Sequence, residues 1–350
     1  MRRRDFIKNA VVSGLITTVS SAGAETPQQP VTVSTKPESR NKDNSKTDTS
    51  TETETGTAAL RSVPPTYYRT AMIDGIPVAY REAGQPGAPV VLLLHGWPSS
   101  SRMYRNLIPL LADKYHVIAP DYPGFGHSGV PPRSEYNYSF DRMGEIVEAL
   151  IQKLQIESFA LYVMDFGAPI GFRLMLKKPG RMTALIAQNA PVAPSGSPWS
   201  KVLAQYWKDG STQSRQNARV YLDPEAIKQH YLIGVQDVSR IDPDDWLVDS
   251  CLVNRPGLDE IHLDMLHDIP SNVPVFKAAQ EYFRTHRPPT LIATGANDVV
   301  FSGEYMKKYL ADLPDAEFHL LDSGHFALED HCDEIASLMR DFLGRTIKNS

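Results

Sequence analysis

Cysteine is scarce in this sequence, with only Cys251 and Cys332 among 350 residues. The two lie far apart, neither belongs to a CxxC pair, and their surroundings have no spacing typical of a metal site. A small fold held together by disulfides and a cysteine-ligated metal centre are therefore excluded. We expect two unpaired thiols.

Excess positive charge is also missing. The chain has 36 Lys and Arg against 41 Asp and Glu, a net charge of -5 and a pI near 6.1. No basic run or basic helix occurs, so nucleic acid is not an expected partner. No apolar stretch is long enough for a permanent membrane-spanning helix, so we expect no stable membrane anchor. The composition, 41% hydrophobic and 22% charged, is typical of one globular domain with an insertion, or of two small domains.

The first 24 residues have the pattern of an export signal. Residues 2–8 read RRRDFIK, followed by the apolar, small-residue run AVVSGLITTVSSAGA, whose last residues fit a signal peptidase site. This segment resembles a bacterial twin-arginine signal peptide. The resemblance implies a mature protein that begins near Glu25, uses the twin-arginine export machinery as a partner, and is periplasmic or secreted. No cysteine follows the run, which excludes a lipoprotein anchor.

Residues 25–62 are mostly Thr, Ser, Glu, Lys, Pro and Gln, with almost no large apolar side chains. Such a segment cannot bury enough apolar surface to offset the loss of chain entropy on folding. We predict a disordered tether between the signal and the folded part of the chain.

Strand and helix patterns alternate from residue 63 to residue 192 and again from 288 to 350. Two strand-like runs flank a hairpin turn at Asp74-Gly75. The apolar run APVVLLLHGW then predicts a central strand, and the alternation that follows predicts a parallel sheet covered by helices. The helical block at 193–287 interrupts this pattern, and we expect it to form a lid over the carboxyl ends of the strands.

Four short motifs fall where these strands are predicted to end. They are HGWP at 95–98, VMDFG around Asp165, TGAND around Asp298, and DSGH ending at His325. An isolated Asp after a strand is often only a helix cap, and an isolated His is often structural. Together, in this order and at strand ends, the motifs indicate a catalytic site.

The order and spacing of these motifs over residues 66–345 resemble the α/β-hydrolase superfamily. The resemblance implies a mostly parallel eight-stranded sheet with an inserted helical lid. It also implies a triad with Asp165 as nucleophile, His325 as base, and Asp298 as the acid that orients the histidine. Backbone N–H groups of Trp97 and Phe166 would form the oxyanion hole. Asn189 stands where some relatives carry the acid, but an amide cannot hold an imidazolium as a carboxylate does.

An aspartate at the nucleophile position restricts the chemistry. Attack on an ordinary ester would give an unstable anhydride, whereas attack on a saturated carbon gives a stable alkyl ester on the protein. His325 would then activate water to hydrolyse that ester. Epoxides and alkyl halides suit this reaction, and neither cofactor nor metal is needed. We therefore expect a small, apolar to moderately polar substrate.

The residues around the nucleophile favour an epoxide over a halide. Relatives that are haloalkane dehalogenases hold halide with an indole N–H beside the nucleophile, where this chain has Phe166. Fluoroacetate-type dehalogenases usually place an Arg pair after the nucleophile, where this chain has Phe166 and Gly167. Epoxide hydrolases use the HGWP turn found here and protonate the ring oxygen with lid tyrosines. The predicted substrate-binding residues are Trp97, Tyr206, Tyr221 and Tyr231, with Tyr282 as a further lid tyrosine.

Three alternatives stay open at this point. A haloalkane or haloacid dehalogenase is the second interpretation. A non-catalytic binding protein that keeps the fold and lid is the third, although such a protein has no need of Asp298 oriented on His325. In the fourth, Asp165 acts as a base on a carbonyl compound.

Overall fold

The computed structural model describes residues 64–347, and the predicted signal (1–24) and tether (25–62) lie outside these residues. The described part contains an eight-stranded sheet with the order β1-β2-β4-β3-β5-β6-β7-β8. Its strands are β1 (Tyr67–Ile73), β2 (Ile76–Ala83), β3 (Val90–Leu94), β4 (His116–Pro120), β5 (Phe159–Met164), β6 (Met182–Gln188), β7 (Thr290–Gly295) and β8 (Glu317–Leu321). Strand β2 pairs antiparallel with β1 and β4, and strands β3 to β8 pair parallel. The predicted mostly parallel sheet is confirmed.

The hairpin between β1 and β2 turns at Asp74-Gly75. Both residues have positive φ, 48° and 79°, and Ile73 pairs with Ile76 across the turn. Two consecutive positive φ values match the twist of the flanking strands, and Asp-Gly adopts them at little cost. The sequence prediction at this turn is confirmed.

The described helices are α2 (Leu107–Leu111), α3 (Phe140–Lys153), α4 (Gly167–Lys177), α5 (Pro198–Asp209), α6 (Thr212–Ala218), α7 (Pro224–Leu232), α8 (Pro243–Val253), α9 (Leu258–Asp268), α10 (Asn272–His286), α11 (Gly303–Met306), α12 (Ala327–Asp330) and α13 (Cys332–Thr346). Short 3₁₀ turns lie at Ser101–Tyr104, Arg219–Leu222, Val238–Arg240, Ile269–Ser271 and Lys307–Ala311. Residues 101–111 and 303–311 each combine a 3₁₀ turn with a short α-helix.

Helices cover both faces of the sheet. Helices α3, α4 and α10 pack side by side, with α4 against β3 and β5, whereas α13 packs on α2, β6 and β7. The central strands β4 and β5 are buried along their whole length. Burial of every residue requires cover on both sides, which explains why these strands are continuous apolar runs.

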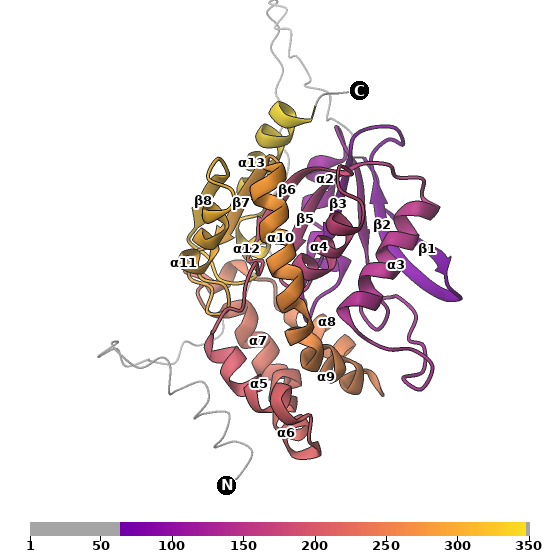
Figure 1. Cartoon of the computed structure of the whole chain (residues 1–350), viewed down its shortest axis with the longest axis vertical. Helices are drawn as coiled ribbons and strands as arrows, with labels where there is room; N and C mark the ends of the chain where they lie inside the picture. The colour runs from indigo at the N-terminus through magenta and orange to yellow at the C-terminus, as the bar shows by residue number, and fades with distance from the viewer. Residues whose placement is uncertain (1–63, 348–350) are drawn as a thin grey trace, which may run out of the picture. The chain divides into compact units, whose positions relative to one another are not determined.

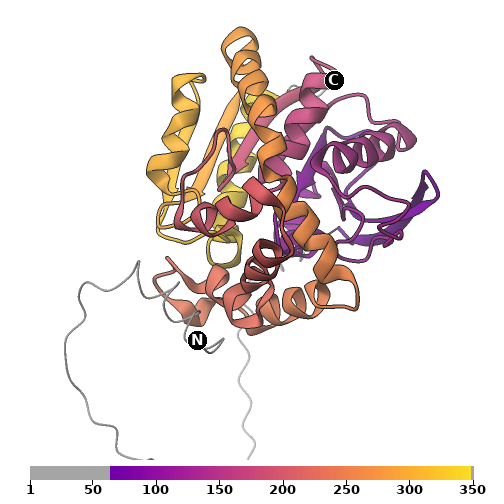
Figure 2. The ribbon, with the colours of Figure 1, turned by 60° about the horizontal axis from the view of Figure 1, so that its bottom comes forward.

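The insertion between β6 and β7 forms the lid. Helices α5 to α9 gather beyond one end of the sheet in Figures 1 and 2. Local sequence sets the first residue of two of these helices. Asp223 caps α7 and Asp242 caps α8, and each cap is followed by proline at the first helical position. The last helix of the insertion, α10, packs against α4. The lid proper is therefore α5 to α9, while α10 belongs to the layer on the sheet.

Three features of the described residues bear on function. None of the helices within residues 64–347 is long and apolar enough to cross a bilayer. No group of three or more His, Cys, Asp or Glu in that range is arranged to hold a metal ion. Cys251 is exposed, Cys332 is partly buried, and both are free thiols.

Candidate active site

Asp165 lies at a sharp turn between β5 and α4. Its φ is +47°, in the left-handed region that side-chain-bearing residues rarely adopt. Glycines make the tight approach possible. A Cβ on Gly167 would lie 2.1 Å from the Leu94 carbonyl oxygen, and a Cβ on Gly96 would lie 2.6 Å from the Asp165 Cβ. The turn therefore fixes the carboxylate against the end of β3, as a nucleophile elbow requires.

Backbone N–H groups hold the Asp165 carboxylate. The Trp97 N–H donates to Asp165 Oδ1 at 2.8 Å. Burial raises the pKa of Asp165 above its ordinary value, while His325 and the N–H groups of Trp97 and Phe166 act in the opposite direction. The two N–H groups thus stabilise negative charge on this carboxyl group, where charge would develop during attack on its carbon.

His325 and Asp298 form a buried pair. The Nδ1 of His325 lies 2.8 Å from Asp298 Oδ2, and their side chains are 2% and 0% exposed. Burial alone would lower the pKa of His325, but Asp298 and then Asp165 raise it above its ordinary value. His325 Nε2 has no hydrogen-bond partner among the described residues. It is therefore free to take a proton from water.

Asp298 is held by two further donors. Its Oδ1 accepts the Val300 N–H at 2.7 Å, and its Oδ2 accepts the Asn189 Nδ2–H at 2.9 Å. Burial alone would raise the pKa of Asp298, but His325 and these donors outweigh burial and place it below the ordinary value. Asn189, whose own φ is +43°, therefore supports the acid. The sequence identified its position but not this contact.

A cavity of about 490 Å³ opens on Asp165. Its wall is mostly apolar, with contributions from the core, the lid and α10. The large lining side chains are Trp97, Phe140, Phe166, Trp199, Leu203, Trp207, Leu266, Ile269, Phe276 and Phe301. Trp97, one of the predicted substrate-binding residues, is among them. Such a wall suits an apolar substrate body with few polar groups.

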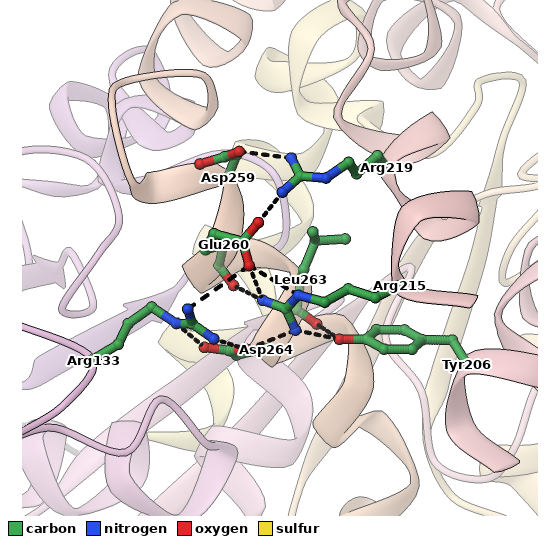
Figure 3. Close-up of polar contacts among 8 residues, drawn as sticks. All are labelled: Arg133, Tyr206, Arg215, Arg219, Asp259, Glu260, Leu263 and Asp264. Carbon is green, nitrogen blue, oxygen red and sulfur yellow. Dashed lines mark hydrogen bonds and ion pairs between the residues drawn. The ribbon is translucent and has the colours of Figure 1, made fainter. Parts of the chain in front are cut away.

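The lid tyrosines do not line this cavity, which corrects their assignment as substrate-binding residues. Figure 3 shows the reason for Tyr206: its hydroxyl contacts Arg215 and the Leu263 carbonyl, within a cluster of lid ion pairs that Arg133 joins from the core. Its hydroxyl is therefore satisfied between lid helices.

Tyr221, Tyr231 and Tyr282 are likewise engaged elsewhere. The Tyr221 hydroxyl donates to the Trp199 carbonyl, and the Tyr231 hydroxyl donates to Asp249. Tyr282 stacks on His286, with ring centroids 4.1 Å apart. Sequence spacing could not distinguish these packing roles from ring-opening roles, because both need a buried tyrosine.

Trp97 uses its indole N–H inside the protein. Its Nε1 donates to His262 Nδ1 at 3.2 Å, and both side chains are buried. Burial lowers the pKa of His262 to about 3, so its ring is neutral and can accept this bond. The indole N–H is therefore not free for a ligand.

The sequence did not identify His230 as a site residue. It lies on α7, is 5% exposed and lines the same cavity as Asp165. Its ring stacks on that of His325, with centroids 4.2 Å apart and an interplanar angle of 21°. No local motif surrounds it, so only the folded lid shows that it reaches the site.

Comparison with known proteins agrees with this geometry. The sequence profile of the family described as alpha/beta hydrolase fold matches residues 89–331. The chain belongs to the alpha/beta hydrolase fold family. This α/β-hydrolase is 40% identical over 281 residues to an uncharacterised hydrolase of Saccharomyces cerevisiae, covering 77% of this chain and 94% of that protein.

Relatives of this α/β-hydrolase with named activities are more distant or shorter matches. A cis-3-alkyl-4-alkyloxetan-2-one decarboxylase of Shewanella oneidensis is 29% identical, covering 78% of this chain and 87% of that protein. A haloalkane dehalogenase of Bradyrhizobium diazoefficiens is 27% identical, covering 76% and 91%. Epoxide hydrolase A of Mycobacterium tuberculosis is 36% identical over 122 residues, 35% of this chain and 38% of that protein.

A solved structure shows the same fold. The haloalkane dehalogenase from Bradyrhizobium elkani superposes with a TM-score of 0.63 at 25% identity, covering 80% of this chain and 98% of that chain. The chain is therefore an α/β-fold hydrolase with dehalogenase and epoxide hydrolase homologues.

Proposed function

We propose that this protein hydrolyses an epoxide to a diol through a covalent ester on Asp165. A carboxylate oxygen of Asp165 forms a bond to one epoxide carbon. The bond from that carbon to the ring oxygen breaks, and the oxygen takes the electron pair and then a proton. The first step leaves a β-hydroxyalkyl ester on the enzyme.

Water completes the cycle. His325, oriented by Asp298, takes a proton from water while the resulting hydroxide adds to the carboxyl carbon of Asp165. The N–H groups of Trp97 and Phe166 stabilise the oxyanion. Collapse releases the diol, whose departing oxygen takes the proton from His325. The carboxyl proton returns to solvent, so one turnover consumes one water molecule and regenerates the carboxylate.

The positions of two side chains are the observation that favours an epoxide over a halide as the substrate. Phe166, beside the nucleophile, has no donor, and the Trp97 indole N–H donates to His262 at 3.2 Å. A departing halide ion needs donors, because it leaves as a separate anion in a mostly apolar cavity. An epoxide oxygen stays attached to the product and needs only one donor and a proton. Haloalkane or haloacid dehalogenation is accordingly the second candidate.

Isotope labelling tests the covalent mechanism. After several turnovers of an aryl epoxide in heavy-oxygen water, mass spectrometry of the peptide that contains Asp165 should show incorporated label. The His325→Gln variant should accumulate an ester with the mass of the added substrate, and Asp165→Asn should accumulate none. An active enzyme without label would refute the ester and favour Asp165 as a base.

A substrate panel distinguishes the remaining candidates. The panel holds an aryl epoxide, a bromoalkane and a 3,4-dialkyl oxetan-2-one, read out as diol, bromide and released carbon dioxide. The proposal expects diol as the dominant product. Bromide release above diol formation would reverse the order of the two candidates. Binding of all three without turnover would indicate a non-catalytic ligand-binding protein.

We also propose that residues 1–24 direct export to the periplasm. The arginine pair of residues 3–4 followed by Phe6, Ile7 and Lys8 supports this. Replacing both arginines with lysine should retain the protein in the cytoplasm of a bacterial host, as measured by fractionation. Unchanged export of the variant would contradict a twin-arginine route.

A further inference from the structure

His230 stands out among the cavity-lining residues because neither of its ring nitrogens, Nδ1 or Nε2, has a hydrogen-bond partner among the described residues. An unpaired buried polar group costs about 1–3 kcal/mol. Such groups are rare in folded proteins and persist mainly where function uses them. His230 is 5% exposed and lines the cavity, so a polar group of a bound substrate is a candidate for the missing partner.

Aromatic rings surround the imidazole. It stacks on His325 and lies against Trp199, whose ring centroid is 4.6 Å away at an interplanar angle of 31°. The rings of Phe326 and Trp97 lie farther away, at 5.4 and 6.1 Å. Stacking fixes the plane of the imidazole and leaves the nitrogens at its edge. The lid thus contributes a tightly packed histidine to the wall that Asp165 also lines.

Other polar groups of the cavity wall have partners or lie at its exposed margin. Trp207 donates its indole N–H to the Leu266 carbonyl at 2.8 Å. Asn272 accepts from Arg173 through Oδ1 at 2.7 Å. Lys201 is exposed. His230 differs from these residues because its ring stacks on that of His325, beside Asp165.

We propose that His230 donates the hydrogen bond, and then the proton, to the epoxide oxygen as Asp165 opens the ring. This assignment rests on the proposed function. One ring nitrogen gives its proton to the oxygen that leaves carbon, while the other nitrogen takes a proton from solvent water. The imidazole changes tautomer and stays neutral. The proton taken from solvent balances the one released when the Asp165 carboxylate is regenerated.

The environment of His230 suits a neutral donor. Burial, and then the adjacent His325, lower the pKa of His230 well below its ordinary value. A neutral imidazole carries one N–H and one free lone pair, which are the two groups that the relay needs. A cation at this position would lie against His325, whose charge disfavours it. His230 thus supplies the proton donor that was predicted to be a lid tyrosine.

A matched pair of substitutions tests the role of His230. Glutamine and methionine have similar length, and both remove the stacking ring, but only glutamine offers an N–H. Both are placed in the His325→Gln background, where the ester cannot turn over, and adduct formation with styrene oxide is followed by intact-protein mass. His230→Met should slow adduct formation on the order of 10²–10³-fold. His230→Gln should recover at least tenfold of that loss.

The same two substitutions, made with His325 intact, show whether His230 acts only through its neighbour. Hydrolysis of the preformed ester should change by less than about threefold in either variant, because His230 acts in the first step. Equal adduct rates in the Gln and Met variants would overturn the proposal. So would a loss confined to ester hydrolysis, because that result would mean His230 only positions His325.

These outcomes separate the role of His230 from the proposed function. If His325→Gln alone forms the adduct but His230→Met forms it equally fast, the ester mechanism stands and the assignment of His230 fails. If the His325→Gln variant forms no adduct while the wild-type enzyme makes diol, the ester mechanism and the assignment of His230 both fail. Thermal unfolding of each variant identifies any loss of activity caused by an unfolded lid, and the Gln to Met ratio in folded protein decides the result.

Discussion

Replacing Asp298 with asparagine should stop the enzyme at the ester. The carboxylate accepts three hydrogen bonds, from His325 Nδ1, Asn189 Nδ2 and the Val300 N–H, at 2.8, 2.9 and 2.7 Å. An amide has one acceptor atom for these three donors. If its NH₂ group faces Asn189 and His325, it donates to Nδ1 and forces the histidine proton onto Nε2. The nitrogen that should accept a proton from water is then blocked.

The size of the effect follows from this tautomer. Fixing a catalytic histidine in the wrong tautomer lowers the rate of its step by about 10⁴-fold, or about 5 kcal/mol. The opposite amide orientation leaves the Val300 N–H facing an NH₂ group, at a cost of about 1–3 kcal/mol in stability. Ring opening by Asp165 does not use His325 as a base, so its rate should change little.

The pH dependence gives a second signature. Asp298 is the main group that raises the pKa of His325, against burial that lowers it. Ester hydrolysis needs neutral His325, so in the wild type it is lost as pH falls through the raised pKa. In Asp298→Asn, burial dominates the pKa of His325 and lowers it. The acid limb of the pH–rate profile for ester hydrolysis should therefore move to lower pH, while the plateau rate falls.

Rapid quench followed by intact-protein mass spectrometry measures both steps with one epoxide. Asp298→Asn should show one equivalent of ester at early times and slow decay. Asp312→Asn, a matched change at a buried carboxylate that pairs with Arg284, should keep normal ester decay. Normal decay in Asp298→Asn, or an acid limb at higher pH, would refute the assignment of Asp298 as the orienting acid.

Three further predictions follow from the geometry. In Gly96→Ala the new Cβ would lie 2.4 Å from Met164 Sδ and 2.6 Å from the Asp165 Cβ. We expect the free energy of unfolding, measured in urea, to fall by about 1–3 kcal/mol and ester formation to slow about 10²-fold. Wild-type kinetics would contradict a steric requirement for glycine. Phe166→Trp adds an indole N–H beside the nucleophile and should raise bromide release from a bromoalkane by about 10–100-fold; no increase would mean that donors do not limit dehalogenation. Burial raises the pKa of Asp249 to about 6. The folded protein therefore favours the protonated carboxyl group, whose contribution to stability is present below the ordinary pKa and is lost as pH rises toward 6. Asp249→Asn should be up to ~3 kcal/mol more stable than wild type near pH 8 and no more stable near pH 3, and an equal difference in stability at the two pH values would contradict the raised pKa.

The core of the site could be predicted because its residues sit in local motifs. A strand followed by a turn with glycine on one side specifies the position of Asp165, whatever the rest of the chain does. Asp298 and His325 also follow strands directly, so the parallel sheet brings them to the same edge. Their burial and the 2.8 Å contact between them follow from strand order.

The side chains by which the lid contributes to the cavity could not be predicted from the sequence. Tyr206 and His230 lie on the lid helices α5 and α7, and the spacing of apolar residues only shows which face of a helix is buried. Whether a buried side chain meets a cavity or another helix depends on how the helices cross. Arg215 and the Leu263 carbonyl engage the Tyr206 hydroxyl, whereas α7 carries His230 over His325.

The sequence by itself therefore determined the sheet and placed Asp165, Asp298 and His325 at strand ends, because backbone turns and strand ends depend on nearby residues. Tertiary structure decided which polar groups around the cavity are already paired. The Trp97 indole N–H donates to His262, and the hydroxyls of Tyr206, Tyr221 and Tyr231 have partners, whereas the His230 nitrogens have none within residues 64–347. Those directions depend on packing between segments far apart in the chain, which local sequence does not encode.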